Sequence, residues 1–162
     1  MILQLISKIY KPKNILRITS DCPLLDYRIV DKVVSKFEKS KVDYAANTLK
    51  FTYPDGMDIE VFNFKTLKET FLNTKSKHDQ EHVTTYMKRS KKFKLLNIPY
   101  KKNYSFLRLT VDHQDDLTLC VRIMEKLDDK SSFYLEDIIS VYKKNKFMFN
   151  INKKYIHPKI LK

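Results

Sequence analysis

The sequence predicts an α/β fold with a mostly parallel sheet and helices on both of its faces. Short strand-like segments alternate with helix-like segments along 162 residues, a length that fits one domain with a substantial core. Hydrophobic residues make up 43% of the chain and aromatic residues 12%, which favours a packed fold over disorder. Because no repeat or Pro-, Gly- or Ser-rich linker divides it, we expect residues 1–162 to form a single domain.

Hydrophobic periodicity gives the elements of the first half. Asp26 is placed to cap a helix whose apolar residues recur on one face. Asp55 and Gly56 follow Pro54 and predict a turn between two strands. The expected strands are 14–19, 44–47 and 59–64, and the expected helices are 27–39, 65–73 and 79–88.

In the second half the clearest element is a helix over 114–127. Asp115 and Asp116 suit its positive N-terminus, and five apolar residues recur along one face: Leu117, Cys120, Val121, Met124 and Leu127. The other expected elements are strands at 93–98 and 106–111 and a helix at 135–143 that Ser132 caps. We expect residues 145–162 to form an irregular tail.

Glycine is scarce, and this limits the chemistry that the sequence can support. The single glycine is Gly56, whereas average usage is roughly 7%. A phosphate-cradling loop needs glycines so that backbone N–H groups can close on the anion. The sequence therefore contains no loop of that kind.

The formal net charge of +13 is compatible with a polyanionic partner. Only five of the 32 basic residues are arginines, although nucleic-acid readers favour arginine, so a compositional excess of lysine is the preferred explanation. Cys22 and Cys120 lack a CxxC spacing and are expected to be buried free thiols. Without an apolar run of about 18 residues, we expect no membrane span and a cytoplasmic protein.

Two aspartates stand out by position. Asp21 and Asp112 each follow an expected strand directly, and ligands of open α/β sheets gather at the carboxyl ends of strands. Two carboxylates placed there could share one Mg²⁺, which prefers oxygen ligands and bridges to phosphates. From spacing alone, the alternative that both residues cap a helix or a turn stays open.

Four segments in order carry a resemblance to a known family. They are 18–26 (Ile-Thr-Ser-Asp-Cys-Pro-Leu-Leu-Asp), 53–62 (Tyr-Pro-Asp-Gly-Met-Asp-Ile-Glu-Val-Phe), 81–86 (Glu-His-Val-Thr-Thr-Tyr) and 107–117 (Leu-Arg-Leu-Thr-Val-Asp-His-Gln-Asp-Asp-Leu). The series resembles the cytidylyltransferases of the spore-coat-polysaccharide type, which are relatives of acylneuraminate and CMP-KDO synthetases. The resemblance covers residues 14–127, with a weaker echo in 133–155.

The resemblance implies a Rossmann-like nucleotide-diphosphosugar-transferase fold. It implies that CTP and a sugar or sugar acid give a CMP-sugar and pyrophosphate in surface polysaccharide biosynthesis, in an enzyme that is often a homodimer. It places Mg²⁺ on the catalytic residues Asp21 and Asp112. Substrate-binding residues would be Asp55, Asp58, Glu60, Glu81, His82 and Tyr86. Turn and cap roles remain open for this second set.

The sequence also departs from the family pattern. Family members begin with a strand and a Gly-, Arg- and Lys-containing loop that holds the nucleotide, and this sequence has no counterpart of either. We therefore expect a truncated or split cytidylyltransferase whose amino-terminal part is missing, which leaves an apolar edge or face exposed. We expect it to be inactive alone.

Three other hypotheses are alternatives to the interpretation of this chain as a cytidylyltransferase fragment. His78, Glu81 and His82 fit the H-x-x-E-H pattern of a zinc site, but no third protein ligand is marked. The charge allows a basic nucleic-acid-binding module, although the sequence lacks a recognition signature. A remnant that only dimerises is the third alternative.

Overall fold

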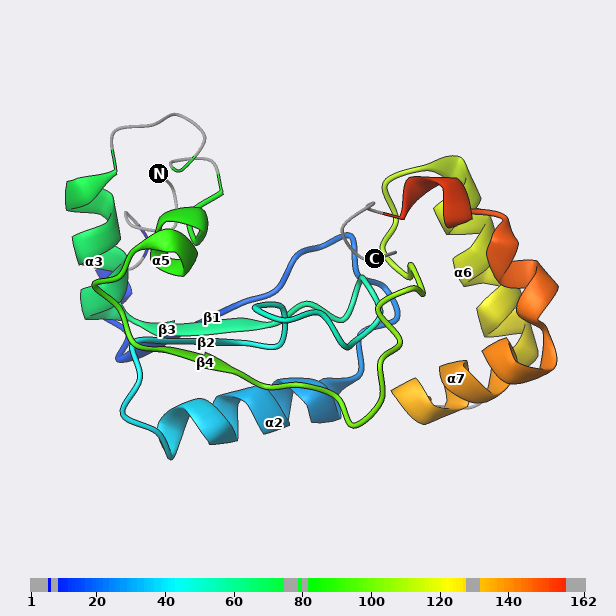
Figure 1. The fold of residues 1–162 in the computed structure, drawn as a ribbon, viewed down its shortest axis with the longest axis horizontal. Coiled ribbons are helices and arrows are strands. Elements are labelled where there is room, and N and C mark those ends of the chain that lie inside the picture. Colours follow the sequence, from blue (N-terminus) through cyan, green and yellow to red (C-terminus); the bar gives the residue numbers. More distant parts are fainter. Residues whose placement is uncertain (1–5, 7–8, 75–78, 80–81, 128–131, 157–162) are drawn as a thin grey trace.

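The computed structural model describes residues 6, 9–74, 79, 82–127 and 132–156. A four-stranded sheet lies at the centre, in the order β1-β3-β2-β4 (Figure 1). Its strands are β1 (Asn14–Arg17), β2 (Tyr44–Ala46), β3 (Glu60–Asn63) and β4 (Leu95–Asn97). All four lie within segments that periodicity predicts as strands, although each is shorter than predicted.

The sheet is mixed, so the prediction of a mostly parallel sheet is confirmed only in part. Strand β3 runs antiparallel to both β1 and β2, and only β2 and β4 pair in parallel among the described strands. The chain turns back at Gly56 between β2 and β3, where Met57 N–H donates to the Pro54 carbonyl. Hydrophobic alternation predicts a strand but carries no information about its direction.

Helices cover both faces of the sheet, as predicted. Helix α2 (Tyr27–Glu38) packs against β2 and β3 on one face, and α3 (Phe64–Asn73) with the short α5 (Thr85–Arg89) lies on the other (Figure 1). Alternation along the strands supplies each face: Ala45 joins the core under α2, and Tyr44 joins the core under α3 and α5.

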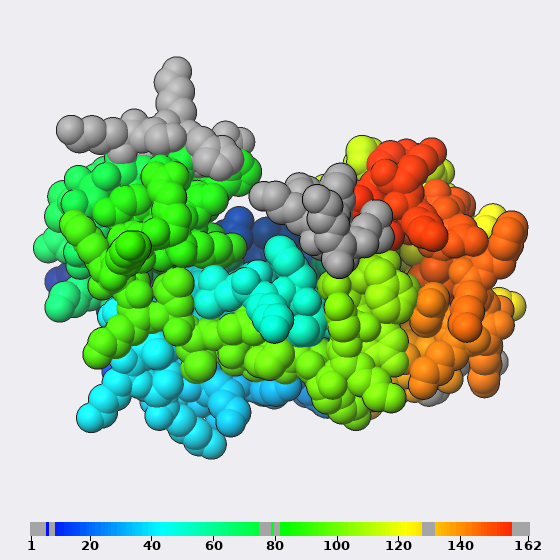
Figure 2. Space-filling view, in the orientation of Figure 1, coloured from blue at the N-terminus to red at the C-terminus, as the bar shows by residue number. Residues whose placement is uncertain are grey.

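Two further helices, α6 (Gln114–Leu127) and α7 (Leu135–Lys144), pack on each other at the far end of the molecule (Figures 1 and 2). The strand expected over 106–111 does not form, because this segment makes one isolated bridge, Asp55 to Arg108, in place of a ladder. Where the structure describes it, the tail expected to be irregular forms two 3₁₀ helices, Lys146–Asn150 and Lys153–Tyr155.

The buried face of α6 differs from the prediction. Its buried residues are Asp116, Leu119, Cys120, Ile123 and Leu127. Cys120 and Leu127 of the predicted apolar face are buried, but Leu117, Val121 and Met124, which were predicted on the same face, are 45 to 49% exposed. Helical spacing alone cannot separate the two apolar faces, and the fully buried Asp116 decides which one turns inward.

The two cysteines are free, but only Cys120 is buried. Cys22 is half-buried beside Asp21, which corrects the expectation for this residue. In the described part of the chain, no helix is long and apolar enough to cross a membrane.

Asp26 caps two helices at once. Its carboxylate accepts from Arg28 N–H at the start of α2 and from Leu135 N–H at the start of α7. The cap on α2 was predicted; the cap on α7 takes the place expected for Ser132. Burial acts to raise the pKa of Asp26, but hydrogen bonds from the Arg28 side chain and both N–H groups outweigh it and lower this pKa.

We expect Asp26→Asn to lower the free energy of unfolding by about 2 kcal/mol at pH 7. Because the pKa of Asp26 is lowered in the folded state, its carboxylate stabilises the fold above about pH 4 and this contribution fades as the pH falls further. Urea titrations at pH 7 and pH 3 measure the difference between wild type and variant. An equal difference at both pH values would contradict the assignment; Asp31→Asn, on the exposed side of α2, is the control.

Candidate active site

The structure brings the segments of Asp21 and Asp112 together. Val111 N–H and the Thr110 hydroxyl donate to the backbone carbonyl of Asp21, at 2.8 and 3.2 Å. The two chain segments therefore meet at one end of the sheet, where each follows a short apolar run. This contact places the backbone of Asp21 directly beside the residues that precede Asp112.

Arg108 ties three acidic residues into a cluster. Its guanidinium donates to Asp55 at 3.0 Å, to Asp112 at 2.5 Å and to both carboxylate oxygens of Asp116 at 3.0 Å. The Arg108 side chain is 9% exposed and Asp116 is fully buried, whereas half of the Asp112 side chain is exposed. Asp112 thus presents its carboxylate to solvent from a fixed position.

Asp116 fixes the backbone as well as the arginine. Its Oδ2 atom accepts from the N–H groups of Asp112 and His113, at 3.1 and 3.0 Å. Asn152, which is also buried, donates to Asp116 Oδ1 and to the Arg108 carbonyl. A residue of the carboxyl-terminal segment therefore binds both members of the Arg108–Asp116 ion pair.

Asp21 lies half-buried beside two small polar side chains. The hydrogen bond from Thr19 is the main cause that lowers the pKa of Asp21, and the Cys22 thiol contributes a further hydrogen bond. The carboxylate is therefore ionised at neutral pH. Burial raises the pKa of the Cys22 thiol to about 11, which keeps the thiol protonated and able to donate.

The turn after β2 adds two half-buried carboxylates to this edge. Burial raises the pKa of Asp55, and the ion pair with Arg108 works against that shift. Burial also raises the pKa of Asp58 to about 7, and the negative charges of Asp55, Glu60 and Asp21 add to the shift. Asp58 is therefore partly protonated at neutral pH and can both donate and accept hydrogen bonds.

Glu60 is held by the fold itself. This buried carboxylate accepts from Arg17 at 2.7 Å, from Lys88 and Tyr44 at 2.6 Å, and from the Thr84 hydroxyl at 3.0 Å. Burial acts to raise its pKa, and these partners lower it overall. In this structure Glu60 joins β1, β2 and β3 to α5.

The described part of this motif, residues 82–86, lies beside Glu60, since the Thr84 hydroxyl binds the Glu60 carboxylate. His82 is exposed, and the half-buried Tyr86 packs edge-on against Phe93 with ring centroids 6.3 Å apart. Glu81 lies outside the described residues, as does His78, so the H-x-x-E-H pattern is not described as a unit.

The acidic edge supplies the donors that Mg²⁺ requires. Asp21 offers an ionised carboxylate and Asp112 offers a half-exposed one, and hard divalent cations take oxygen ligands. In the described ranges no group of three or more His, Cys, Asp or Glu side chains is arranged to hold a metal ion by itself. The residues fit an ion that completes its coordination with water and substrate phosphate.

Three residues that matter here were missed by sequence reasoning: Arg108, Asp116 as its partner, and Asn152. A signal for the first was present. In this lysine-rich sequence, four of the five arginines pair with carboxylates in the structure: Arg17, Arg28, Arg89 and Arg108. Arginine binds a carboxylate with two parallel hydrogen bonds, which lysine cannot.

Replacing Arg108 by Gln leaves the buried Asp116 carboxylate without its cation, so we expect a loss of about 3 kcal/mol in the free energy of unfolding. Arg108→Lys should lower the free energy of unfolding by less, because lysine keeps the positive charge. It should still be destabilising, because lysine cannot donate two parallel hydrogen bonds to Asp116. Chemical denaturation measures both, with Arg122→Gln on the exposed surface of α6 as the matched control. Equal stability of the Arg108 and Arg122 variants would refute the role given to Arg108.

Comparison with known proteins places this geometry in a family. The family model for cytidylyltransferases matches residues 3–155. The solved structure of a cytidylyltransferase from Leptospira borgpetersenii serovar Hardjo-bovis has a TM-score of 0.85 at 29% identity, covering 91% of this chain and 63% of that chain.

A curated relative, an uncharacterised protein of Methanocaldococcus jannaschii, is 33% identical over 150 residues, covering 90% of this chain and 60% of the relative. The chain thus spans less than two thirds of the length of both proteins. Since the family match extends over nearly all of its residues and a solved cytidylyltransferase has the same mixed α/β fold, this chain belongs to the cytidylyltransferase family.

Proposed function

We propose that this protein forms part of a nucleotidyltransferase that joins CTP to a sugar or sugar acid, releasing pyrophosphate and a CMP-sugar. Family membership supports the use of CTP. The observation that carries the proposal is the acidic edge at which the Asp21 and Asp112 segments meet. The resemblance to spore-coat-polysaccharide enzymes suggests that the reaction serves surface polysaccharide synthesis in the cytoplasm. It also predicts that the protein forms a homodimer.

Asp21 and Asp112 are the residues that would hold Mg²⁺. When bound, the ion offsets the charge of the triphosphate and of the departing pyrophosphate. Arg108 serves this pair by holding Asp112 in place while leaving its carboxylate half-exposed. The protein's contribution is then mainly positioning and electrostatics.

The sugar would bind next to this pair. Asp58 suits a sugar hydroxyl because, with a pKa of about 7, it exchanges readily between accepting and donating. Asp55, Glu81, His82 and Tyr86 are further proposed sugar contacts from the resemblance. Glu60, which the resemblance also assigns to substrate binding, would act here by holding β1, β2, β3 and α5 in place, since four side chains of the fold already occupy its carboxylate: Arg17, Tyr44, Thr84 and Lys88.

The phosphates of CTP require a cradle that residues 1–162 do not contain. One glycine in the whole sequence is too few for a Gly-rich loop, and the chain spans about 60% of its relative's length. We therefore propose that residues 1–162 supply the metal-and-sugar part of the site. Turnover would require a nucleotide-binding segment in addition.

Metal binding tests the first part of this proposal. Titration of the protein with Mn²⁺, followed by the loss of free-ion EPR signal, should reveal one site. Asp21→Asn and Asp112→Asn should each weaken it by about tenfold or more, because each removes a charged oxygen donor. Asp31→Asn, which removes the same charge from the surface of α2, should leave it unchanged. Equal weakening in all three variants would mean nonspecific attraction and would rule out the site.

Turnover tests the second part. Residues 1–162 with CTP, Mg²⁺ and a panel of sugars and sugar acids should release no pyrophosphate above background. Translation of the DNA upstream of the Met1 codon in all frames shows whether a Gly-rich strand-loop-helix segment exists there. If it does, the joined protein should release pyrophosphate, and Asp112→Asn should abolish that release. Robust turnover by residues 1–162 alone would disprove the need for the added segment.

A further inference from the structure

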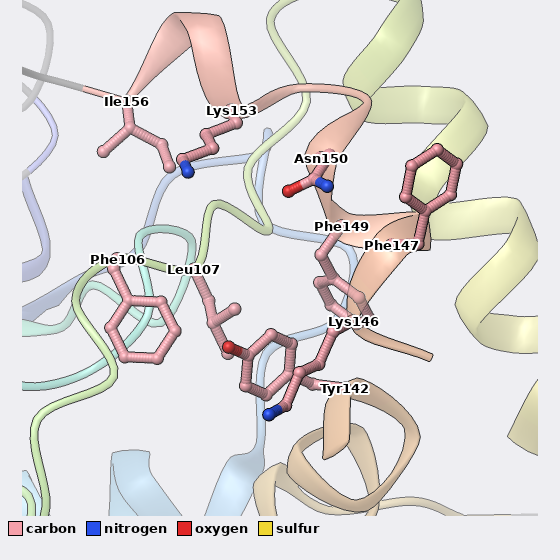
Figure 3. A pocket seen from close by; sticks show the side chains of 9 residues that line it. All are labelled: Phe106, Leu107, Tyr142, Lys146, Phe147, Phe149, Asn150, Lys153 and Ile156. Atoms are coloured by element: carbon pink, nitrogen blue, oxygen red, sulfur yellow. The ribbon is translucent and has the colours of Figure 1, made fainter. Parts of the chain in front are cut away.

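A hollow of about 560 Å³ lies outside the acidic edge, between residues 106–107 and the carboxyl-terminal segment 142–156 (Figure 3). Its volume falls in the range of small-molecule sites. None of the carboxylates of the candidate active site lines it. It therefore calls for an explanation separate from the proposed transfer reaction.

The hollow is a packed feature of the fold with an apolar, largely aromatic lining. Leu107, Phe149 and Ile156 are buried, at 3, 7 and 9% exposure. The ring of Tyr142 lies 5.6 Å from that of Phe106 and 5.2 Å from that of Phe149, measured between centroids. These rings offer flat apolar surface to an occupant, and stacked or edge-on aromatic contacts add to the burial of area.

Two cations stand at the border of the hollow. Lys146 and Lys153 enter it from different sides in Figure 3. In the part of the chain that the structure describes, no acidic side chain pairs with either, whereas the neighbouring Lys154 pairs with Asp115 at 3.0 Å. An apolar hollow with an ammonium group on each of two sides favours an anion that carries an apolar body.

We propose that this hollow binds an organic phosphate with a flat, aromatic body. The rings of Phe106 and Tyr142 would contact the body, and the ammonium group of Lys146 or of Lys153 would bind the phosphate. Neither the phosphate nor the aromatic body is enough by itself. Inorganic phosphate would leave the apolar lining in contact with water, and a neutral aromatic compound would form no ion pair with the lysines.

An occupant would also stabilise the candidate active site. Asn150 and Lys153 line the hollow, and Asn152 between them holds the Arg108 carbonyl and the Asp116 carboxylate. A ligand that fixes the 150–153 segment therefore favours the arrangement in which Asn152 binds the Arg108 carbonyl and the Asp116 carboxylate. Binding should raise the thermal midpoint of unfolding, since a ligand that binds only the folded state stabilises it.

Calorimetric titration of the full chain with 1-naphthyl phosphate tests the proposal. We expect one saturable site, with 1-naphthol and inorganic phosphate each binding at least about tenfold more weakly. The double variant Lys146→Ala, Lys153→Ala should weaken 1-naphthyl phosphate by about tenfold or more. Lys36→Ala, Lys143→Ala removes the same charge from exposed positions outside the hollow and should bind as wild type does.

Three results would overturn the proposal. One is the absence of saturable binding to wild type with an intact thermal transition. Another is an equal loss of affinity in the two double variants, which means general attraction to a basic protein. The third is a concentration-dependent dimer in sedimentation that Phe147→Asp dissociates, because a second copy would then occupy the hollow; Phe147 lies on its rim and is 88% exposed.

Discussion

The buried guanidinium of Arg108 is the interaction on which the arrangement of this site depends. It joins the turn of Asp55, the segment that ends at Asp112, and helix α6 through Asp116. A buried carboxylate without a partner is costly, so these three parts of the chain must come together for the fold to form. The geometry of the acidic edge is therefore a consequence of folding and needs no bound ligand to create it.

The same ion pair explains where sequence reasoning succeeded and where it failed. Helix α2 was predictable because burial is periodic along it and Asp26 marks its start, and the four strands were predictable because each lies in a short apolar-rich run of the sequence. The rotation of α6 was not, since the helix has apolar residues on two faces and an aspartate, Asp116, faces the core. Strand direction was unpredictable for another reason: the chain reverses within residues 47–59 between β2 and β3, and hydrophobic alternation carries no information about that reversal.

The candidate site was partly predictable. An aspartate directly after an apolar run indicated Asp21 and Asp112, and the structure joins their segments through backbone hydrogen bonds. Arg108 and Asn152 were not predicted: the partners of Arg108 are 4 to 53 residues distant in sequence and those of Asn152 are 36 to 44 residues distant, and sequence spacing does not show which of these pairs form. The scarcity of arginine was the one usable signal for Arg108. In a sequence whose basic residues are mostly lysine, a rare arginine indicates a position where a planar guanidinium pairs with a carboxylate.

Charge distribution relates these features to the chemistry. The chain carries +13 overall, yet the edge formed by Asp21, Asp55, Asp58 and Asp112 is acidic, and Arg108 neutralises only part of it. A triphosphate that approached this edge bare would be repelled. The excess of lysine therefore does not make this edge a nucleotide site, and under the proposed function a divalent cation between the carboxylates and the phosphates would resolve the conflict. This is the physical reason that the metal-binding variants are the decisive test of the proposed function.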